Sequence, residues 1–161
     1  VKSTLDGLEK KIDILVPLFE NKQSCFLLGK GPGEATAREG ALKIKEITYI
    51  HAEGCNTSSL KHGPFALLEK DFPVILFATN NKYFSKNENA YEEIKSRHAN
   101  IIYITDKNGI CKENMIKISY NETYQDYLAI IPIQLLAYKL SLERNINPDM
   151  PRNLAKVVTV E

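Results

Sequence analysis

Hydrophobic and polar residues follow two different periods along this chain. In four segments, apolar side chains recur every three or four residues or helix-forming residues predominate, which predicts helices. These segments are residues 3–20, 34–45, 90–98 and 124–144. Pro17 should end or kink the first of them. A further short helix is expected over 59–68, with a bend at Gly63-Pro64.

Short apolar or alternating runs lie between the helical segments. Runs of this length, bounded by glycine, asparagine or proline, predict strands. They occur at residues 25–28, 47–53, 72–79, 100–105 and 115–119, with polar loops expected at 54–59 and 80–89. Because strands and helices alternate and the connections are long, we expect a parallel sheet of about five strands with helices on both faces. The fold class is therefore a three-layer, doubly wound α/β sheet.

Length and composition place the chain among globular proteins of one domain. Its 161 residues can bury a core, and a hydrophobic content of 43% with 25% charged residues is ordinary. We expect a single domain over 1–161 that ends in a tail at 145–161. The net charge of +1 gives no reason to expect nucleic acid or an anionic membrane as a partner. No apolar run approaches the ~18 residues that span a bilayer.

The three cysteines, Cys25, Cys55 and Cys111, are odd in number and lack the spacing of metal ligands. We interpret them as reduced thiols of a cytoplasmic protein and expect no metal site.

A glycine-rich turn follows the first predicted strand. Gly29, Gly31 and Gly33 lie between that strand and the helix after it, an order typical of α/β units that bind nucleotides or phosphosugars. The turn does not match the dinucleotide-binding fingerprint, because its third glycine is misplaced. Thr36 supplies the only nearby hydroxyl, so we do not expect this turn to capture a phosphate.

Three charged residues share one face of the helix that follows the turn. Glu39, Lys43 and Glu46 are spaced by four and three residues. Spacing alone favours a solvated ion pair worth about 0.2–0.5 kcal/mol. The alternative is an acid, a base and an ammonium that face a cleft, which we would expect at the carboxyl ends of the strands.

Two longer stretches carry a family resemblance. Residues 39–53 read EGALKIKEITYIHAE and residues 60–64 read LKHGP. Together they closely resemble the second of the two sugar-isomerase (SIS) domains of glutamine–fructose-6-phosphate aminotransferases, the glucosamine-6-phosphate synthases. Residues 151–161, PRNLAKVVTVE, resemble the carboxy-terminal tail of that family. The resemblance implies the SIS fold, with flavodoxin-like topology.

The resemblance also implies a role for individual residues. Position alone would make Lys156 a solvated charge, but the matching lysine of the family forms a Schiff base with C2 of fructose-6-phosphate. Glu46 matches the base that moves a proton between C1 and C2. Lys43 matches a donor to the sugar oxygens, and Glu39 matches a residue that orients this donor. Ala155, beside the active lysine, is expected to contact the substrate.

His62 would more often be structural when taken by itself. The matching histidine of the family acts in opening of the sugar ring and comes from the neighbouring subunit, a role that suits the titration range of imidazole. Two departures from the family lie close to these sites. Ser58-Ser59 replace the usual Gly-Glu pair, and Val157 stands where the family has serine.

The resemblance implies that the whole enzyme converts fructose-6-phosphate and glutamine to glucosamine-6-phosphate and glutamate. It implies no metal or organic cofactor. The implied partners are the sugar phosphate, a first SIS domain, a glutaminase domain and a second copy of the chain. Two alternatives remain. One is another SIS enzyme, such as a deglycase or a phosphosugar isomerase, against which the tail at 151–161 argues. The other is a non-catalytic module that senses phosphosugars, which turnover would exclude.

Overall fold

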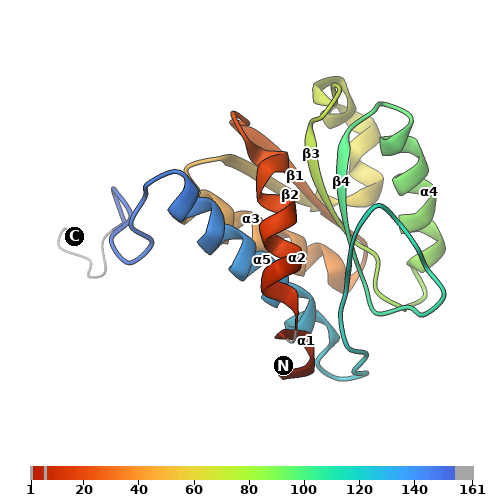
Figure 1. The fold of residues 1–161 in the computed structure, drawn as a ribbon. Coiled ribbons are helices and arrows are strands. Elements are labelled where there is room, and N and C mark those ends of the chain that lie inside the picture. The colour runs from red at the N-terminus through yellow and green to blue at the C-terminus, as the bar shows by residue number, and fades with distance from the viewer. Residues whose placement is uncertain (1, 6, 155–161) are drawn as a thin grey trace, which may run out of the picture.

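The computed structural model describes residues 2–5 and 7–154. One parallel sheet lies between two helical layers (Figure 1). Its strands are β1 (Ser24–Gly29), β2 (His51–Asn56), β3 (Pro73–Phe77), β4 (Asn100–Thr105) and β5 (Asn114–Lys117). The α-helices are α1 (Lys2–Leu5), α2 (Leu8–Leu15), α3 (Pro32–Thr48), α4 (Phe84–Lys95) and α5 (Gln125–Glu143). Three short 3-10 helices are η1 (Val16–Phe19), η2 (Thr57–His62) and η3 (Pro64–Leu67).

The strand order is β2-β1-β3-β4-β5, and every neighbouring pair is parallel. This order is the flavodoxin-like one, so the predicted fold class is confirmed. The chain leaves β1, returns through α3 and adds β2 on one side of β1. It then crosses to the other side and adds β3, β4 and β5 in turn. Because the direction of winding changes between β1 and β3, α3 and α4 cover opposite faces of the sheet.

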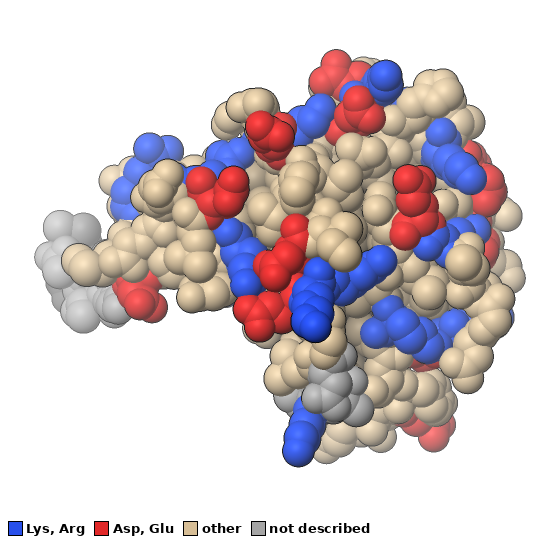
Figure 2. All heavy atoms as spheres, in the orientation of Figure 1, with Lys and Arg blue, Asp and Glu red and all other residues tan. Residues whose placement is uncertain are grey.

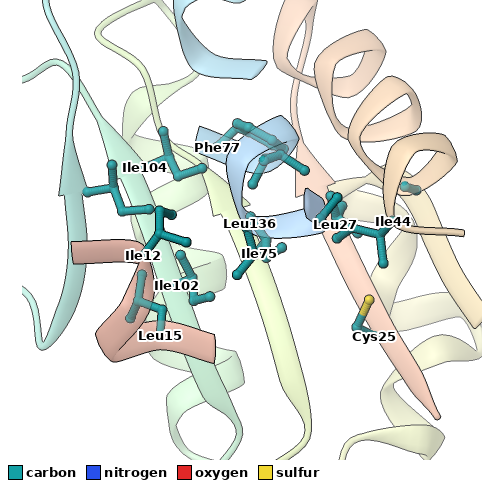
Figure 3. Close-up of a cluster of buried hydrophobic side chains, with 14 of the residues drawn as sticks. Ile12, Leu15, Cys25, Leu27, Ile44, Ile75, Phe77, Ile102, Ile104 and Leu136 are labelled. Carbon is teal, nitrogen blue, oxygen red and sulfur yellow. The ribbon is translucent and has the colours of Figure 1, made fainter. Parts of the chain in front are cut away.

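Alternate residues of the strands supply two hydrophobic cores. On one face, Leu27 and Ile75 of the sheet pack with Ile44 of α3 and Leu136 of α5 (Figure 3). On the other face, Phe26 and its neighbours pack beneath α4, η2 and η3. Since successive side chains of a strand point to opposite faces, a strand that is covered on both sides must be apolar throughout. This explains the continuous apolar runs of β1, β3 and β4.

The structure corrects the first predicted helix. Residues 3–20 do not form one helix, because Gly7 takes a left-handed conformation with φ 73° between α1 and α2. As expected, the α-helix ends before Pro17: α2 stops at Leu15, and Pro17 lies in η1.

Two other predicted boundaries are wrong for reasons of side-chain hydrogen bonding. The strand predicted at 47–53 begins only at His51, since α3 continues through Thr48, whose hydroxyl donates to the Ile44 carbonyl at 2.7 Å. Helix α4 begins within the predicted polar loop at 80–89. Asn87 can be buried there because its amide donates to the Phe77 carbonyl and its oxygen accepts from Thr57, both at 3.0 Å.

The turn between β1 and α3 requires glycine at position 29. A Cβ atom on Gly29 would lie 2.1 Å from the Gly33 carbonyl oxygen, a contact with backbone that cannot move aside. We therefore expect Gly29→Ala to lower the free energy of unfolding by about 3 kcal/mol, measured by urea denaturation. Gly33→Ala is the matched control, since its Cβ would meet only Phe77 at 3.7 Å. Equal urea midpoints for the two variants would contradict this close approach.

Candidate active site

Helix α3 carries the three charged residues of the predicted site. It connects the carboxyl end of β1 to the amino end of β2, so it runs antiparallel to the strands. Its last turn therefore lies at the amino ends of the strands, where Arg144 donates to the carbonyl oxygens of Thr48, at 3.3 Å, and of Lys22. The expectation that Glu46 faces a cleft at the carboxyl ends of the strands is wrong, because a crossover helix must return to the opposite edge.

Lys43 lies between the two carboxylates. Its Nζ atom is 3.0 Å from Glu46 Oε2 and 3.5 Å from Glu39 Oε1. The hydrogen bond from Lys43 to Glu46 raises the pKa of the lysine above its ordinary value, against a smaller opposing effect of burial. Lys43 therefore remains a cation at neutral pH, and its hydrogen bond can hold the Glu46 side chain in place.

The exposure of this triad allows contact with a ligand. The side chains of Lys43 and Glu46 are 33% and 28% exposed, whereas that of Glu39 is 51% exposed. The ion pairs predicted from spacing are thus formed, and the two inner side chains keep accessible surface. A carboxylate that is fixed by a neighbouring ammonium and still reaches solvent can accept a proton from a bound molecule.

Within one chain, His62 lies far from the triad of Glu39, Lys43 and Glu46. It ends η2, is exposed, and follows the carboxyl end of β2, whereas Glu46 precedes the amino end of that strand. Six residues of strand at about 3.3 Å each separate the two positions by roughly 17 Å or more. The predicted Lys156 and Ala155 lie outside the described residues.

Sequence reasoning missed a contact between α3 and the carboxy-terminal segment. The backbone N–H of Arg152 donates to the Tyr49 hydroxyl at 2.8 Å, and the Arg152 guanidinium lies 4.1 Å from the centre of the Tyr49 ring. Tyr49 immediately follows α3 with φ 59°. No sequence pattern signals this pair, because the alternation over 47–53 predicts a strand at Tyr49.

At the carboxyl edge of the sheet, the glycine-rich turn is linked to the end of β2. Lys30 donates to Asn56 at 3.4 Å and to Ser58, and Asn56 donates to Glu34 at 2.7 Å. Hydrogen bonds from Arg38 and Asn56 lower the pKa of Glu34. The polar side chains next to this turn are therefore hydrogen-bonded to one another.

Two cavities lie away from the triad. One of about 710 Å³ is bounded by α2, η1 and α5, with Asp13, Lys139 and Arg144 in its wall. The other, of about 320 Å³, lies beside η2 and α4. Neither is lined by Glu39, Lys43 or Glu46.

Surface charge and potential metal ligands are both distributed over the described residues. Figure 2 shows basic and acidic side chains interspersed over the face that it draws. Among residues 2–5 and 7–154, no group of three or more His, Cys, Asp or Glu side chains could hold a metal ion. None of the helices described has both the length and the hydropathy needed to cross a bilayer.

The sequence profile of the SIS domain matches residues 18–144, from η1 to the residue after α5. The chain belongs to the SIS domain family. This assignment confirms the resemblance found in the sequence, and the matched range includes β1 to β5 together with α3 and its charged triad.

Curated relatives of this SIS domain are named as aminotransferases. The chain is 51% identical over 162 residues to a probable glutamine–fructose-6-phosphate aminotransferase of Acanthamoeba polyphaga mimivirus, covering 99% of this chain and 27% of that protein. It is 43% identical over 150 residues to the glutamine–fructose-6-phosphate aminotransferase of Thermococcus kodakarensis, covering 91% of this chain and 25% of the relative. The chain thus spans about a quarter of the length of these relatives.

Solved structures agree with the SIS fold. The carboxy-terminal domain of glucosamine-fructose-6-phosphate aminotransferase from Francisella tularensis superposes with a TM-score of 0.78 at 32% identity, over 89% of this chain and 42% of that one. Tagatose-6-phosphate ketose/aldose isomerase from Escherichia coli gives a TM-score of 0.70 at 19% identity, over 87% of this chain and 44% of that one. The second likeness concerns the fold alone.

Proposed function

We propose that this SIS domain is the second sugar-isomerase domain of a glutamine–fructose-6-phosphate aminotransferase. In the whole enzyme it would help to convert fructose-6-phosphate and glutamine to glucosamine-6-phosphate and glutamate. The observation that carries the proposal is the 51% identity to the mimivirus protein, which extends over 99% of the chain. That alignment is long enough to include both Glu46 and Lys156, the two residues to which we assign the chemistry.

In this proposal Lys156 is the nucleophile. Its neutral amine adds to the C2 carbonyl of open-chain fructose-6-phosphate, and water leaves as the imine forms. Because the product carries an amine at C2, ammonia from glutamine must then replace the lysine nitrogen. The exchange leaves an imine at C2 of the sugar and returns Lys156 to the free amine.

Glu46 is the proton carrier. It takes a proton from C1 and delivers one to C2, so that C1 becomes an aldehyde and C2 carries the amine. Lys43, 3.0 Å from the Glu46 carboxylate, holds that group in place and donates to sugar oxygens. Glu39 orients Lys43 from the other side, at 3.5 Å, and Ala155 contacts the substrate next to the imine.

His62 opens the sugar ring by proton transfer to the ring oxygen, and we assign it to the site of a neighbouring subunit. The length of β2 between His62 and Glu46 supports this assignment, because one chain cannot bring both to the same sugar. Because this assignment needs two subunits at one site, the proposal includes a homodimer.

The rest of the enzyme, which is about three-quarters of the length of the relatives, supplies a first SIS domain that holds the phosphate and a glutaminase domain that releases ammonia. We place the enzyme in the cytoplasm.

The proposal predicts different activities for the full-length enzyme and for this chain. The full-length protein should form glucosamine-6-phosphate from fructose-6-phosphate and glutamine. The 161-residue chain alone should sediment as a dimer, form no amino sugar from glutamine, and convert little fructose-6-phosphate to glucose-6-phosphate in a coupled assay. Robust isomerisation by the chain alone would contradict the proposal and favour a stand-alone SIS enzyme. No amino sugar from the full-length protein would contradict it as well.

A further inference from the structure

Helix α5 is predominantly apolar on every side, although one of its sides is exposed. Three of its 19 residues carry charge, namely Asp126, Lys139 and Glu143. A helix that is apolar all round is normally buried all round. Yet Tyr127, Tyr138 and Leu142 are 73%, 45% and 48% exposed. The outward side of α5 therefore suits a neighbour that the described residues do not supply.

The exposed residues of α5 form one stripe along the helix. Tyr127, Ile131, Tyr138 and Leu142 follow one another at intervals of four, seven and four residues, which places them on one face. Tyr127 and Leu142 are 15 positions apart, which is about 22 Å along a helix axis. Gln134 lies on the same face and is uncharged. We call these five residues the α5 ridge.

Helices of the same layer close both flanks of the α5 ridge. On one side, Lys139 forms ion pairs with Glu9 of α2, at 2.7 Å, and with Asp13 of α2, at 3.1 Å. On the other side, α3 packs so closely that a Cβ atom on Gly40 would lie 3.2 Å from the Ile133 side chain. The ridge thus faces away from the sheet, in the layer formed by α2, α3 and α5 (Figure 1).

Exposed apolar side chains are concentrated in this layer. Leu42 of α3 and Ile14 of α2 are exposed as well. Helix α4 of the opposite layer, all of which is described, exposes no large apolar side chain. Single apolar residues scattered over a surface need no explanation, whereas a contiguous patch marks an interaction site. The distribution therefore identifies one face of the molecule as an interface.

The charged triad needs the same face to be covered. Glu39, Lys43 and Glu46 line neither of the two cavities. A small ligand is normally enclosed over most of its surface. Leu42, which is exposed, lies three residues after Glu39 and four before Glu46, so the apolar surface adjoins the triad. A surface that packs on this layer therefore also supplies a wall for the site.

We propose that the α5 ridge is the docking surface for the first SIS domain of the full-length enzyme, and that this docking encloses the charged triad. The inference rests on the proposed function, which supplies that domain. The chain covers 42% of the carboxy-terminal domain of the Francisella tularensis enzyme, so more than half of that domain lies outside the match. A domain tethered in the same polypeptide has a high effective concentration, so a surface of modest size suffices to hold it.

A second copy of the chain is the rival occupant of the ridge. The proposed function assigns the contact between subunits to η2, which carries His62 and packs through Leu60 on the opposite face of the sheet from α5. A two-fold dimer uses one and the same patch on each subunit. With η2 in that patch, the α5 ridge is left for a different partner.

Hydroxyl-radical footprinting tests whether the ridge is covered. The full-length enzyme and the 161-residue chain are oxidised in parallel, and the rates at individual side chains are compared. Because water is excluded from the centre of an interface, Tyr127 and Tyr138 should react roughly five-fold or more slowly in the full-length enzyme. Leu67, exposed on η3 of the opposite layer, should react equally in both. Equal rates at Tyr127 and Tyr138 in the two proteins would overturn the proposal.

Substitution at Tyr138 tests what the docking does. Tyr138→Glu places an unpaired charge in the interface, so kcat of the full-length enzyme should fall about ten-fold or more while the protein sediments as a dimer. Tyr138→Phe keeps the ring, so kcat should stay within about two-fold of the parent value. Ser85→Glu adds the same charge to an exposed position of α4 and should also leave kcat unchanged.

Stability of the 161-residue chain separates docking from damage to the fold. Since Tyr138 is about half exposed in this chain, its Tyr138→Glu variant should unfold at nearly the same urea concentration as the parent. If the variant unfolds earlier, the footprint of the parent enzyme decides the question by itself.

The outcomes distinguish the docking surface from the reaction. Dissociation of the Tyr138→Glu enzyme into monomers would assign the ridge to a second copy and overturn the proposal, as would a kcat equal to that of the parent. In both cases the proposed function stands as long as the parent enzyme forms glucosamine-6-phosphate. A full-length parent that protects Tyr127 and Tyr138 but forms no amino sugar would remove the proposed function and leave the contact in place.

Discussion

Replacing Glu46 with glutamine should lower the turnover of the full-length enzyme by about 10²–10⁴-fold. Glutamine has nearly the same shape and still accepts the hydrogen bond that Lys43 donates to Glu46 at 3.0 Å, but it cannot take a proton from C1. Binding of the sugar does not require that proton transfer, so KM for fructose-6-phosphate should change little. The measurement is the steady-state rate of glucosamine-6-phosphate formation.

A matched control for this substitution lies on the same helix. Glu34 forms a comparable ion pair with Arg38 at 2.8 Å, about three helical turns before Glu46. Glu34→Gln should therefore leave kcat close to that of the parent enzyme. Near-normal turnover of the Glu46→Gln enzyme would reject Glu46 as the proton carrier, and a large loss in the Glu34→Gln enzyme would show that the effect comes from the helix as a whole.

The fold was predictable from sequence where burial decides the structure. β1 and β4 are covered on both faces, and their apolar runs have no other stable placement. The error at the start of α4 occurs where distant partners satisfy a polar side chain. Asn87 is helical because Phe77 and Thr57 bind its amide, and no local pattern reports those partners.

The same distinction applies to the candidate site. The contact of Lys43 with Glu46 follows from a spacing of three residues on a helix, so the sequence alone predicts it. The contact between Tyr49 and Arg152 joins residues that are 103 positions apart. It depends on α3 ending at Thr48, and the sequence pattern placed that boundary wrongly. Contacts within one helix can thus be inferred from periodicity. Contacts between elements can be inferred only when the ends of the helices and strands are predicted correctly.

The carboxyl end of α3 is where separate parts of the chain meet. Arg144 binds the Thr48 carbonyl from the end of α5, and Arg152 binds Tyr49 one residue later. Glu46 lies within the same turn. The helix end that holds the proposed base is therefore tied both to α5 and to the segment that leads to Lys156. Contacts from two directions brace this helix end, so the position of Glu46 relative to α5 is held fixed.

Treatment of the full-length enzyme with borohydride in the presence of fructose-6-phosphate should leave a hexitol-phosphate on Lys156. Borohydride reduces the imine to a stable secondary amine, and peptide mass mapping locates it. Because only the neutral amine attacks the carbonyl, trapping should accelerate with rising pH, up to about ten-fold per unit, until the lysine is deprotonated.

The Lys156→Arg enzyme provides the decisive comparison for that adduct. Arginine keeps the positive charge and the length of the side chain, but its guanidinium stays protonated and forms no imine. Both trapping and amino-sugar formation should fall to background in this variant, since no other group of the site replaces the nucleophile. A hexitol-phosphate on Lys43 or on any other lysine, or turnover by the Lys156→Arg enzyme close to that of the parent, would remove Lys156 from the mechanism.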